Sequence, residues 1–520
     1  MSSSAPADFH VAFANPEDAA APWMYDAMHF SKPFPRLGQE FFRAVNREAF
    51  GLDTVFANGY GFTKNFAPPP PTAEVLERGV VNIWTQDFVP RIEKYCADVR
   101  ARDYDSMTAV DLARSLPALL TDMGKIFEYT MIVVFPFMGP TLALVEFAEQ
   151  ALGPDGPMLV ASLLQAETNE TAAAGAALND LVDLAASLPD VASALRDERF
   201  AALESVAGGP QFLAAFRTYL ENYGWRADDW GLVHVPTWAE NPRTPLNMLA
   251  AYLRDRGRSP GASLKRAAEL RAAAEREFAT RLDAEKRAQL QGMLDVAKPH
   301  VMISEGRAFW QLTIVGSTRV PLLALGRKLQ AAGALDDPND LFYLDAAELN
   351  EAAGHPNAAT KELVTARKAE YAAWEQMMPP PFVGAPPDMA GAPPEVQSVF
   401  RRFFGLGVPP SQDASVVTGN AASGGVVRGR ARVVKRLAEA DALQPGEILV
   451  CTLTAPPWTP LFAIAAAVVT DTGGIMSHSA ICAREFAIPC VVGTTFGTSV
   501  IPDGAMITVD GDKGTVRIEG

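Results

Sequence analysis

The chain has 520 residues, of which 48% are hydrophobic and 20% are charged. At about 150 residues per domain, this length suggests about three domains or two large ones, with enough chain to bury a core without disulfides. The net charge of −16 argues against a nucleic-acid or anionic membrane surface, because phosphate groups must be met by clustered cations. Four cysteines with no CxxC pair argue against a disulfide framework and against a zinc site, so we expect no metal site.

The first residues of the sequence and the length of its apolar runs help to predict the cellular compartment of the protein. The sequence begins with MSSSAPADFH, which has neither the basic nor the apolar segment of a signal peptide. No apolar run reaches about 18 residues without a polar interruption, so we expect no membrane span. These features predict a soluble, cytoplasmic protein.

Residues 1–375 are expected to form one mostly helical domain. The first quarter is rich in proline and aromatic residues, and its run of four prolines, 68–71, predicts a stiff surface turn between helices. From about residue 75, Ala, Leu, Glu and Arg recur at spacings of three and four, most clearly over residues 264–297. The apolar stripe does not keep strict heptads, which favours packed bundle helices over a coiled coil.

Residues 376–413 are expected to be a linker. The segment is dense in proline, and no long helix tolerates that density. A proline-rich linker of this length permits one domain to move against another, although such segments can also act as rigid spacers.

Residues 414–520 are expected to form a compact α/β domain. Short β-branched runs alternate with Pro-Gly and Asp-Gly turn signals, and one helix is predicted over residues 477–487, ending before Pro489. The predicted fold class is therefore a multidomain protein with a mostly α-helical domain and a carboxy-terminal α/β domain.

The stretch over residues 470–494 carries the strongest chemical signal. A buried strand is followed by Gly473 and Gly474, which allow a tight turn with close backbone approach. Ser477 can cap the next helix and places His478 in its first turn. The amides and the positive end of the helix dipole favour an anion there, so a phosphoryl group on this imidazole would be stabilised.

Two other interpretations of His478 are open at this point. Cys482 lies four residues further along the same helical face, which could indicate a metal pair, but the neighbouring sequence offers no third or fourth ligand. Cys482 is better explained as a small buried apolar side chain. An isolated histidine at a helix start is often structural, and the surrounding pattern is what favours a phosphate carrier here.

That pattern resembles the swivelling phosphohistidine domain of the phosphoenolpyruvate-utilising enzymes. This family includes phosphoenolpyruvate synthase, pyruvate phosphate dikinase, rifampin phosphotransferase and the phenylphosphate synthase type of enzyme, and its core has approximately the form TxxGGxxSHxAIxARExxIPxVVG. The resemblance implies that His478 carries the phosphoryl group. We assign phosphate-supporting roles in the same motif to Thr472, Gly473, Gly474, Ser477 and Arg484.

The amino-terminal region resembles, more loosely, the acceptor-binding domain of rifampin phosphotransferase-like proteins. The resemblance covers most of residues 20–375 and is carried by residues 23–33, 223–242 and 324–349. No Walker-type loop is recognisable, nor a nucleotide-binding domain ahead of residue 20. The resemblance therefore implies a separate ATP-grasp subunit as partner, which would bind ATP and Mg²⁺ and phosphorylate His478.

The composition of the amino-terminal region suggests the kind of acceptor. An apolar pocket with few polar anchors suits a small aromatic compound better than a sugar or pyruvate. We expect the hydroxyl of phenol or of a hydroxyphenyl ketone as the acceptor, with an aryl phosphate as product and a role in aromatic compound catabolism. The aromatic and methionine residues that motivate this expectation are Trp23, Met24, Tyr25, Phe30, Tyr60, Phe62, Phe127, Tyr129, Phe135, Phe137 and Met138.

Candidate helpers for the transfer are cations and histidines. Arg307, Arg319 and Lys328 lie in a predicted helical region and could stabilise the transferring phosphoryl group, or could belong to a solvated helix face. His29 and His234 could act as base for a phenol, whose pKa is near 10, or could be structural.

The function predicted from these features is one subunit of a two-component, ATP-dependent phosphotransferase acting through His478. One alternative is a phosphoenolpyruvate synthase or dikinase-like component, which would be expected to carry a phosphoenolpyruvate-binding barrel after the histidine domain. Another is a non-catalytic phosphocarrier or regulatory protein, for which some 350 residues of aromatic-rich helical domain would be excessive.

Overall fold

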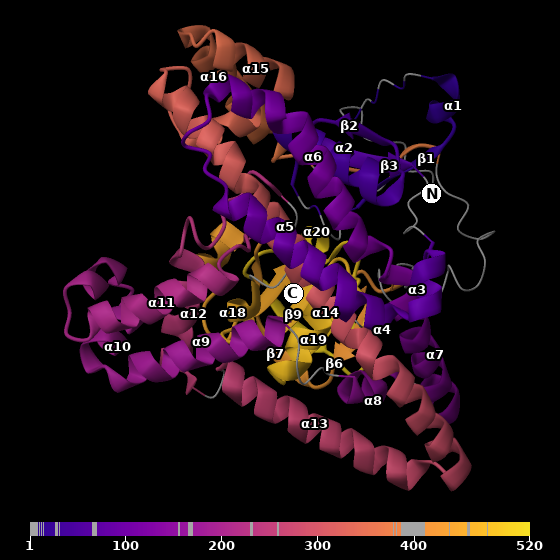
Figure 1. The fold of residues 1–520 in the computed structure, drawn as a ribbon. Helices are drawn as coiled ribbons and strands as arrows, with labels where there is room; N and C mark the ends of the chain where they lie inside the picture. The colour runs from indigo at the N-terminus through magenta and orange to yellow at the C-terminus, as the bar shows by residue number, and fades with distance from the viewer. Residues whose placement is uncertain are drawn as a thin grey trace. The chain divides into compact units, whose positions relative to one another are not determined.

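The computed structural model places most of the chain in two compact units (Figure 1). Unit 1 comprises Met1–Pro136, Trp230–Pro236 and Arg307–Ala390, and unit 2 comprises Phe137–Asp229, Thr237–Gly306 and Gly391–Gly520. The structure describes residues 9–519 except for residues 10, 12, 14, 27–29, 31, 65–69, 154–155, 165–169, 229–231, 257–258, 378, 381, 386–410, 436, 455–457 and 476.

Unit 1 is mostly helical, as the sequence predicts. The long helix α14 (Ala284–Ala331) contributes its carboxy-terminal half to this unit. The other elements are α1 (Pro16–Ala19), β1 (Pro22–Tyr25), α2 (Arg36–Val45), η1 (Asn46–Phe50), β2 (Thr54–Ala57), β3 (Tyr60–Lys64), α3 (Ala73–Arg78), α4 (Val80–Ile83), η2 (Trp84–Phe88), α5 (Val89–Ala101), α6 (Ala109–Met131), η5 (Pro338–Tyr343), α15 (Ala346–Gly354), α16 (Ala358–Trp374) and β4 (Phe382–Gly384).

Unit 1 also contains a four-stranded antiparallel sheet that we did not predict. Its strand order is β2-β3-β1-β4. Strands β2 and β3 are joined by Asn58 and Gly59, whose φ angles of 48° and 74° are those of a two-residue hairpin turn. The expected turn between helices at residues 68–71 therefore leads instead from strand β3 to helix α3, although residues 65–69 lie outside the described ranges.

The helices of unit 1 begin at side-chain caps and pack around α6. Thr108 accepts a hydrogen bond from the Asp111 amide at the start of α6, and Asp345 with Glu348 forms a capping box at the start of α15. Helix α6 packs against α2, η1 and α15. Arg367, from α16, forms an ion pair with Glu348 and so ties α16 to α15.

Unit 2 combines helices from the middle of the chain with the carboxy-terminal sheet. Its elements, besides the first half of α14, are α7 (Val134–Leu152), α8 (Gly156–Leu163), α9 (Glu170–Ser187), α10 (Pro189–Arg196), η3 (Phe200–Glu204), α11 (Gly209–Tyr223), α12 (Arg243–Arg254), α13 (Pro260–Arg281), β5 (Val416–Thr418), β6 (Asn420–Ser423), β7 (Val426–Val433), η6 (Leu437–Ala442), β8 (Ile448–Cys451), α18 (Thr459–Phe462), β9 (Ala467–Thr470), α19 (His478–Glu485), β10 (Cys490–Val492), α20 (Gly497–Val500), β11 (Met506–Asp510) and β12 (Thr515–Ile518).

The eight-stranded sheet of unit 2 confirms the predicted α/β character of the carboxy-terminal region. Its strand order is β5-β12-β11-β7-β8-β9-β10-β6, with β7, β8, β9 and β10 parallel to one another and the outer pairs antiparallel. Within β8, Leu449 and Cys451 belong to one hydrophobic core and Ile448 and Val450 to another. The central strands are therefore covered on both faces, as parallel strands usually are.

The helices over residues 137–306 share a core with the carboxy-terminal sheet. One hydrophobic cluster contains residues of helices α9 to α12 together with residues of β8, α18 and α19. Helix α18 packs against α12, and α19 packs against α13. Strand β4 lies inside the segment expected to be a linker, most of which falls outside the described residues, so the domain division at 375 and 413 stays a prediction.

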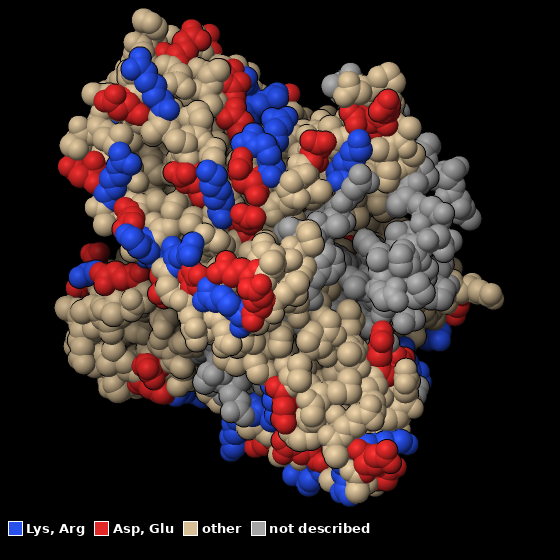
Figure 2. All heavy atoms as spheres, turned by 45° about the vertical axis from the view of Figure 1, so that its right-hand side comes forward, with Lys and Arg blue, Asp and Glu red and all other residues tan. Residues whose placement is uncertain are grey.

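The surface charges and the helices can be compared with the expectation that the protein binds neither nucleic acid nor a membrane. On the face that Figure 2 shows, acidic and basic side chains are interspersed, and the view contains no extended basic field. Within the ranges that the structure describes, no helix has the combination of length and apolar character that crossing a membrane requires.

Candidate phosphohistidine site and aromatic pocket

The predicted phosphohistidine lies at the carboxyl edge of the parallel strands of unit 2. Thr452 and Asp471 directly follow strands β8 and β9, and Thr494 is the second residue after β10. Thr472 donates to the Thr452 carbonyl from both its amide and its hydroxyl, each at 3.1 Å, and Thr494 donates in the same two ways to the Thr470 carbonyl at 3.0 Å. Ligands of α/β sheets commonly bind at this edge.

A tight turn connects β9 to α19. Gly473 has a φ of 99°, and a Cβ at this position would lie 2.9 Å from the Ser477 Oγ. The Ser477 amide donates to the Gly474 carbonyl at 2.9 Å, and the Ser477 Oγ accepts from the Ala480 amide at 3.4 Å. The turn thus requires glycine at 473, and Ser477 is the helix cap that the sequence predicts.

His478 is the first residue of α19 and is half-buried. Its Nε2 and Nδ1 lie 3.3 and 3.7 Å from the Cys482 Sγ, so the thiol packs against the ring edge. Ser479, next in the chain, is fully buried, with its hydroxyl 2.7 Å from the Thr454 hydroxyl. The described residues contain no group of three or more metal-ligating side chains, here or elsewhere.

Arg484 supports the turn from within. The side chain is 5% exposed, and its Nη1 donates to the Ala422 carbonyl at 2.8 Å and to the Ile475 carbonyl at 3.0 Å. Through these bonds it ties the turn and strand β6 to α19. In this structure Arg484 therefore holds the backbone that carries His478 rather than presenting its charge to solvent.

Asp471 is a buried acid of the site that the sequence analysis did not single out. Its carboxylate accepts from the Thr498 amide at 2.8 Å and from the Thr498 hydroxyl, and burial raises its pKa above the ordinary value. It anchors the loop after β10 to the end of β9. Its position between a buried strand and a glycine pair was the available signal.

Arg319 is a buried structural cation. It is 1% exposed, with Nη1 donating to the Val233 carbonyl at 2.6 Å and Nη2 donating to the Asn339 Oδ1 at 2.8 Å. The guanidinium also lies 4.9 Å from the centre of the Phe342 ring. These contacts tie Val233 to α14 and η5 within unit 1.

Arg307 and Lys328 lie elsewhere along α14. The Arg307 Nη1 is 3.7 Å from the Met131 Sδ, whereas the Lys328 Nζ donates to the Asp105 carbonyl at 2.9 Å. The three cations proposed from sequence therefore have different surroundings, and the structure does not gather them into one cluster.

Of the two candidate bases, His234 is described and His29 lies outside the described residues. The His234 Nε2 is 3.1 Å from the Tyr371 hydroxyl. Burial, together with the positive charges of Lys32 and Arg319, lowers its pKa to about 3. The imidazole is therefore neutral near pH 7 and a weak base.

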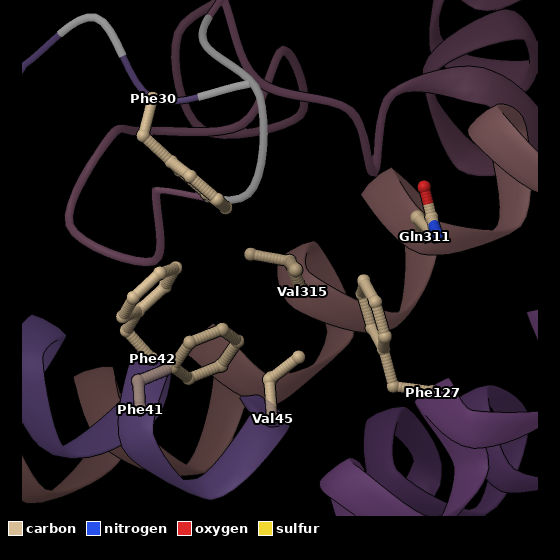
Figure 3. A pocket seen from close by; sticks show the side chains of 7 residues that line it. All are labelled: Phe30, Phe41, Phe42, Val45, Phe127, Gln311 and Val315. Atoms are coloured by element: carbon tan, nitrogen blue, oxygen red, sulfur yellow. The ribbon is translucent and has the colours of Figure 1, made fainter. Parts of the chain in front are cut away.

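An aromatic pocket lies within unit 1 (Figure 3). Its cavity volume is about 20 Å³, and the surrounding non-atom space of about 310 Å³ includes open solvent. Figure 3 shows phenyl rings and valine side chains converging on this space from α2, α6, α14 and the segment before α2. The lining residues are Phe30, Phe41, Phe42, Val45, Phe127, Gln311 and Val315.

The pocket accounts for part of the predicted aromatic set. Phe30 and Phe127 line it. Other members of that set, including Trp23, Tyr25 and Phe62, are buried in a separate core around strands β1 and β3. Gln311 was not predicted, because nothing in the local sequence distinguishes one glutamine on a long helix.

Two family models match the chain. Residues 129–305 match the fourth domain of rifampicin phosphotransferase, and residues 443–514 match the mobile domain of phosphoenolpyruvate-utilising enzymes. The second match includes His478 and the turn around it.

Full-length relatives extend these matches. A chondramide synthase of Chondromyces crocatus is 30% identical over 99% of this chain and 14% of its own length. Rifampicin phosphotransferases of Streptomyces sviceus and Bacillus subtilis are 33% and 29% identical over 68% and 67% of this chain, and 40% of each enzyme is covered. The chain thus spans less than half the length of these relatives. The matches to both domains confirm the predicted resemblance to the phosphoenolpyruvate-utilising enzymes and to rifampicin phosphotransferase.

Proposed function

We propose that the chain carries a phosphoryl group on His478 and delivers it to the hydroxyl of a small phenolic compound. The observation that carries the proposal is the placement of His478. It is half-buried at the first position of α19, after a turn in which Gly473 and Ser477 fix the backbone. The first amides of a helix lack intrahelical partners and favour an anion, so this position suits a phosphorylated imidazole.

The chemistry consists of two displacements at phosphorus. First, an imidazole nitrogen of His478 attacks the donor, an N–P bond forms, and a P–O bond of the donor breaks. Then the phenol oxygen attacks the same phosphorus, the N–P bond breaks, and the hydroxyl proton passes to a base. Histidine suits both steps, because neutral imidazole is a nucleophile near pH 7 and its protonated form is a good leaving group.

The donor in this proposal is a separate ATP-grasp subunit, which binds ATP and Mg²⁺. A swing of the histidine domain about the proline-rich segment would carry the phosphoryl group from donor to acceptor. Helix α19 packs against α13 within unit 2, so such a swing must break and reform this contact. Rigid alignment and electrostatic stabilisation, rather than covalent assistance, dominate phosphoryl transfer.

The aromatic pocket supports an acceptor-binding role over that of a bare phosphocarrier. Four phenylalanines line it, and none of its described lining side chains is charged. Such a pocket favours a neutral aromatic ligand and disfavours pyruvate, whose carboxylate would lose its hydration without a cationic partner.

The test is radiolabelling of the purified chain with ³²P from ATP or from phosphoenolpyruvate, with and without an ATP-grasp subunit. We expect acid-labile, base-stable label only when that subunit and ATP are both present. His478→Ala should abolish the label, whereas His355→Ala, at an exposed histidine after α15, should retain it. Undiminished labelling of His478→Ala would refute the proposal, and labelling from phosphoenolpyruvate would favour the dikinase-like alternative.

A further inference from the structure

We infer that Ile475 is a positioning residue whose side chain seats the phosphohistidine turn on helices α7, α8, α13 and α14. The effect of this contact on phosphoryl transfer rests on the function proposed above, whereas the contact itself does not. Ile475 lies in the β9–α19 turn, three residues before His478, and its side chain is half-buried.

The partner of the Ile475 side chain is a hydrophobic cluster formed by these four helices, with Val145, Leu163 and Phe278 among its buried members. The other residues of the cluster lie between positions 144 and 301, inside the region that matches the fourth domain of rifampicin phosphotransferase. Ile475 is the one described hydrophobic residue after position 301 that packs against it. The contact therefore joins the phosphohistidine turn to the helical region.

The carboxy-terminal region does not use this side chain for its own core. The Ile475 carbonyl accepts from the Arg484 Nη1 at 3.0 Å, and the Gly474 carbonyl accepts from the Ser477 amide at 2.9 Å, so the backbone of the turn is held from within. The described cores on the two faces of the sheet do not include Ile475. Its side chain is thus buried by the helices, and hydrophobic burial favours the arrangement in which the turn lies on them.

This arrangement, which we call docked, also involves the helix that carries the histidine. Helix α13 packs against α19, whose first residue is His478, and His478 is half-buried. A protein donor needs access to the imidazole, so the turn has to leave the helices before loading and return to them for delivery. Ile475 contributes to the equilibrium between the docked and undocked states, because its contact exists only in the docked state.

Carbethoxylation of His478 by diethyl pyrocarbonate, measured on the full chain by mass spectrometry of the modified peptide, tests the contact without any phosphoryl transfer. Each buried methylene shifts such an equilibrium by roughly fourfold, so truncation of a half-buried isoleucine to alanine should raise the undocked fraction about tenfold. We therefore expect His478 to react about tenfold faster in Ile475→Ala than in the wild type. Ile475→Val should give an intermediate rate.

The matched control is Ile518→Ala, the same substitution in strand β12. Ile518 is also half-buried, but it packs against the core of the sheet itself, so its truncation should leave the reaction rate of His478 unchanged. An equal rise in Ile518→Ala, or an unchanged rate in folded Ile475→Ala, would overturn the inference. If Ile475→Ala does not fold, the wild type still decides, because its His478 should react more slowly in the folded chain than in the urea-unfolded chain. Equal rates in those two states would overturn the inference.

The outcomes separate this inference from the proposed function. With the donor and acceptor present, Ile475→Ala should load His478 faster than the wild type and deliver the phosphoryl group more slowly, because the docked state opposes loading and favours delivery. If truncation speeds carbethoxylation but His478 is never phosphorylated, the docking contact stands and the transfer scheme falls. If His478 is phosphorylated but its carbethoxylation does not respond to Ile475, the transfer scheme stands and the docking contact falls.

Discussion

The β9–α19 turn of unit 2 and the aromatic pocket of unit 1 are built in opposite ways. The turn takes its glycines, cap and histidine from one contiguous stretch, residues 470–485, and its geometry follows from local rules for turns and helix starts. The pocket collects its walls from three stretches of chain, the outermost of which, at Phe30 and Val315, lie about 285 residues apart, and only tertiary packing brings them together. Local chemistry can therefore be inferred from a motif, whereas a distributed site requires the fold.

The largest effect is expected from a substitution that destabilises unit 1 and leaves the β9–α19 turn of unit 2 unchanged. A Cβ at Gly59 would lie 2.5 Å from the Trp374 ring and 2.8 Å from the Pro33 Cβ, at a φ of 74°. Gly59→Ala should lower the free energy of unfolding of unit 1 by about 3 kcal/mol or more, since overpacking adds to backbone strain. It should also weaken phenol binding, because the Gly59 carbonyl accepts from the amide of Phe34, which packs on Phe42.

The matched control for this change is Gly333→Ala. Gly333 has a similar φ of 79° but no atom within 4 Å of an added Cβ, so only the backbone strain of about 1–2 kcal/mol is expected. Chemical denaturation followed by tryptophan fluorescence measures both variants. Equal losses would show that the hairpin does not depend on close packing at Gly59.

The second-largest effect is expected from a substitution that disrupts the β9–α19 turn of unit 2 and leaves the aromatic pocket of unit 1 unchanged. Gly473→Ala places a methyl group against Ser477 at a φ of 99°, so it should displace the cap and slow phosphorylation of His478 about tenfold or more. Gly446→Ala, at a φ of 87° with open space around the added Cβ, should leave the rate nearly unchanged. The rate of acid-labile labelling provides the measurement, and binding of a small phenol to unit 1 should be unchanged in both variants. A normal rate in Gly473→Ala would contradict the structural role of the turn.

The smallest effect concerns pH and unit 1. The pKa of His234 is lowered to about 3 from its ordinary 6.5, so between these pH values the unfolded chain binds a proton that the folded chain does not. Stability should therefore fall as the pH drops below about 6.5, by at most about 1.4 kcal/mol per pH unit. His234→Gln should flatten this dependence in denaturant titrations from pH 7 to pH 5.5, over which the wild type should lose about 1.4 kcal/mol, whereas His355→Gln should leave it steep. Identical slopes in the wild type and His234→Gln would contradict the low pKa.

The sequence contained more of the fold than we extracted from it. The Asn58-Gly59 pair between alternating residues is a strong hairpin signal, yet the proline and aromatic content of that region obscured it. Strand β4 was hidden for a different reason, because its partner β1 lies more than 350 residues away. By contrast, the cap at Ser477 and the turn at Gly473 depend on neighbouring residues alone, and both were predicted.

The functional side chains likewise divide into those that a local motif identifies and those that only the folded structure reveals. His478 was predicted from its motif, and the structure places it at the first position of α19. Asp471 could be noticed in the sequence from its position before the glycine pair, but its hydrogen bonds to Thr498 are visible only in the folded protein. Arg319 shows the converse, since a charged residue that suggests catalysis in the sequence is engaged with Val233 and Asn339 in the fold.

The most direct test of the central claim is to locate the phosphate on the protein isolated from its host under alkaline conditions. Mass spectrometry of the peptide containing residues 477–484 distinguishes His478 from its neighbours Ser477 and Ser479. We predict an acid-labile phosphate on His478. An acid-stable phosphate on either serine, or a peptide that never carries phosphate while the acceptor is being turned over, would contradict the account.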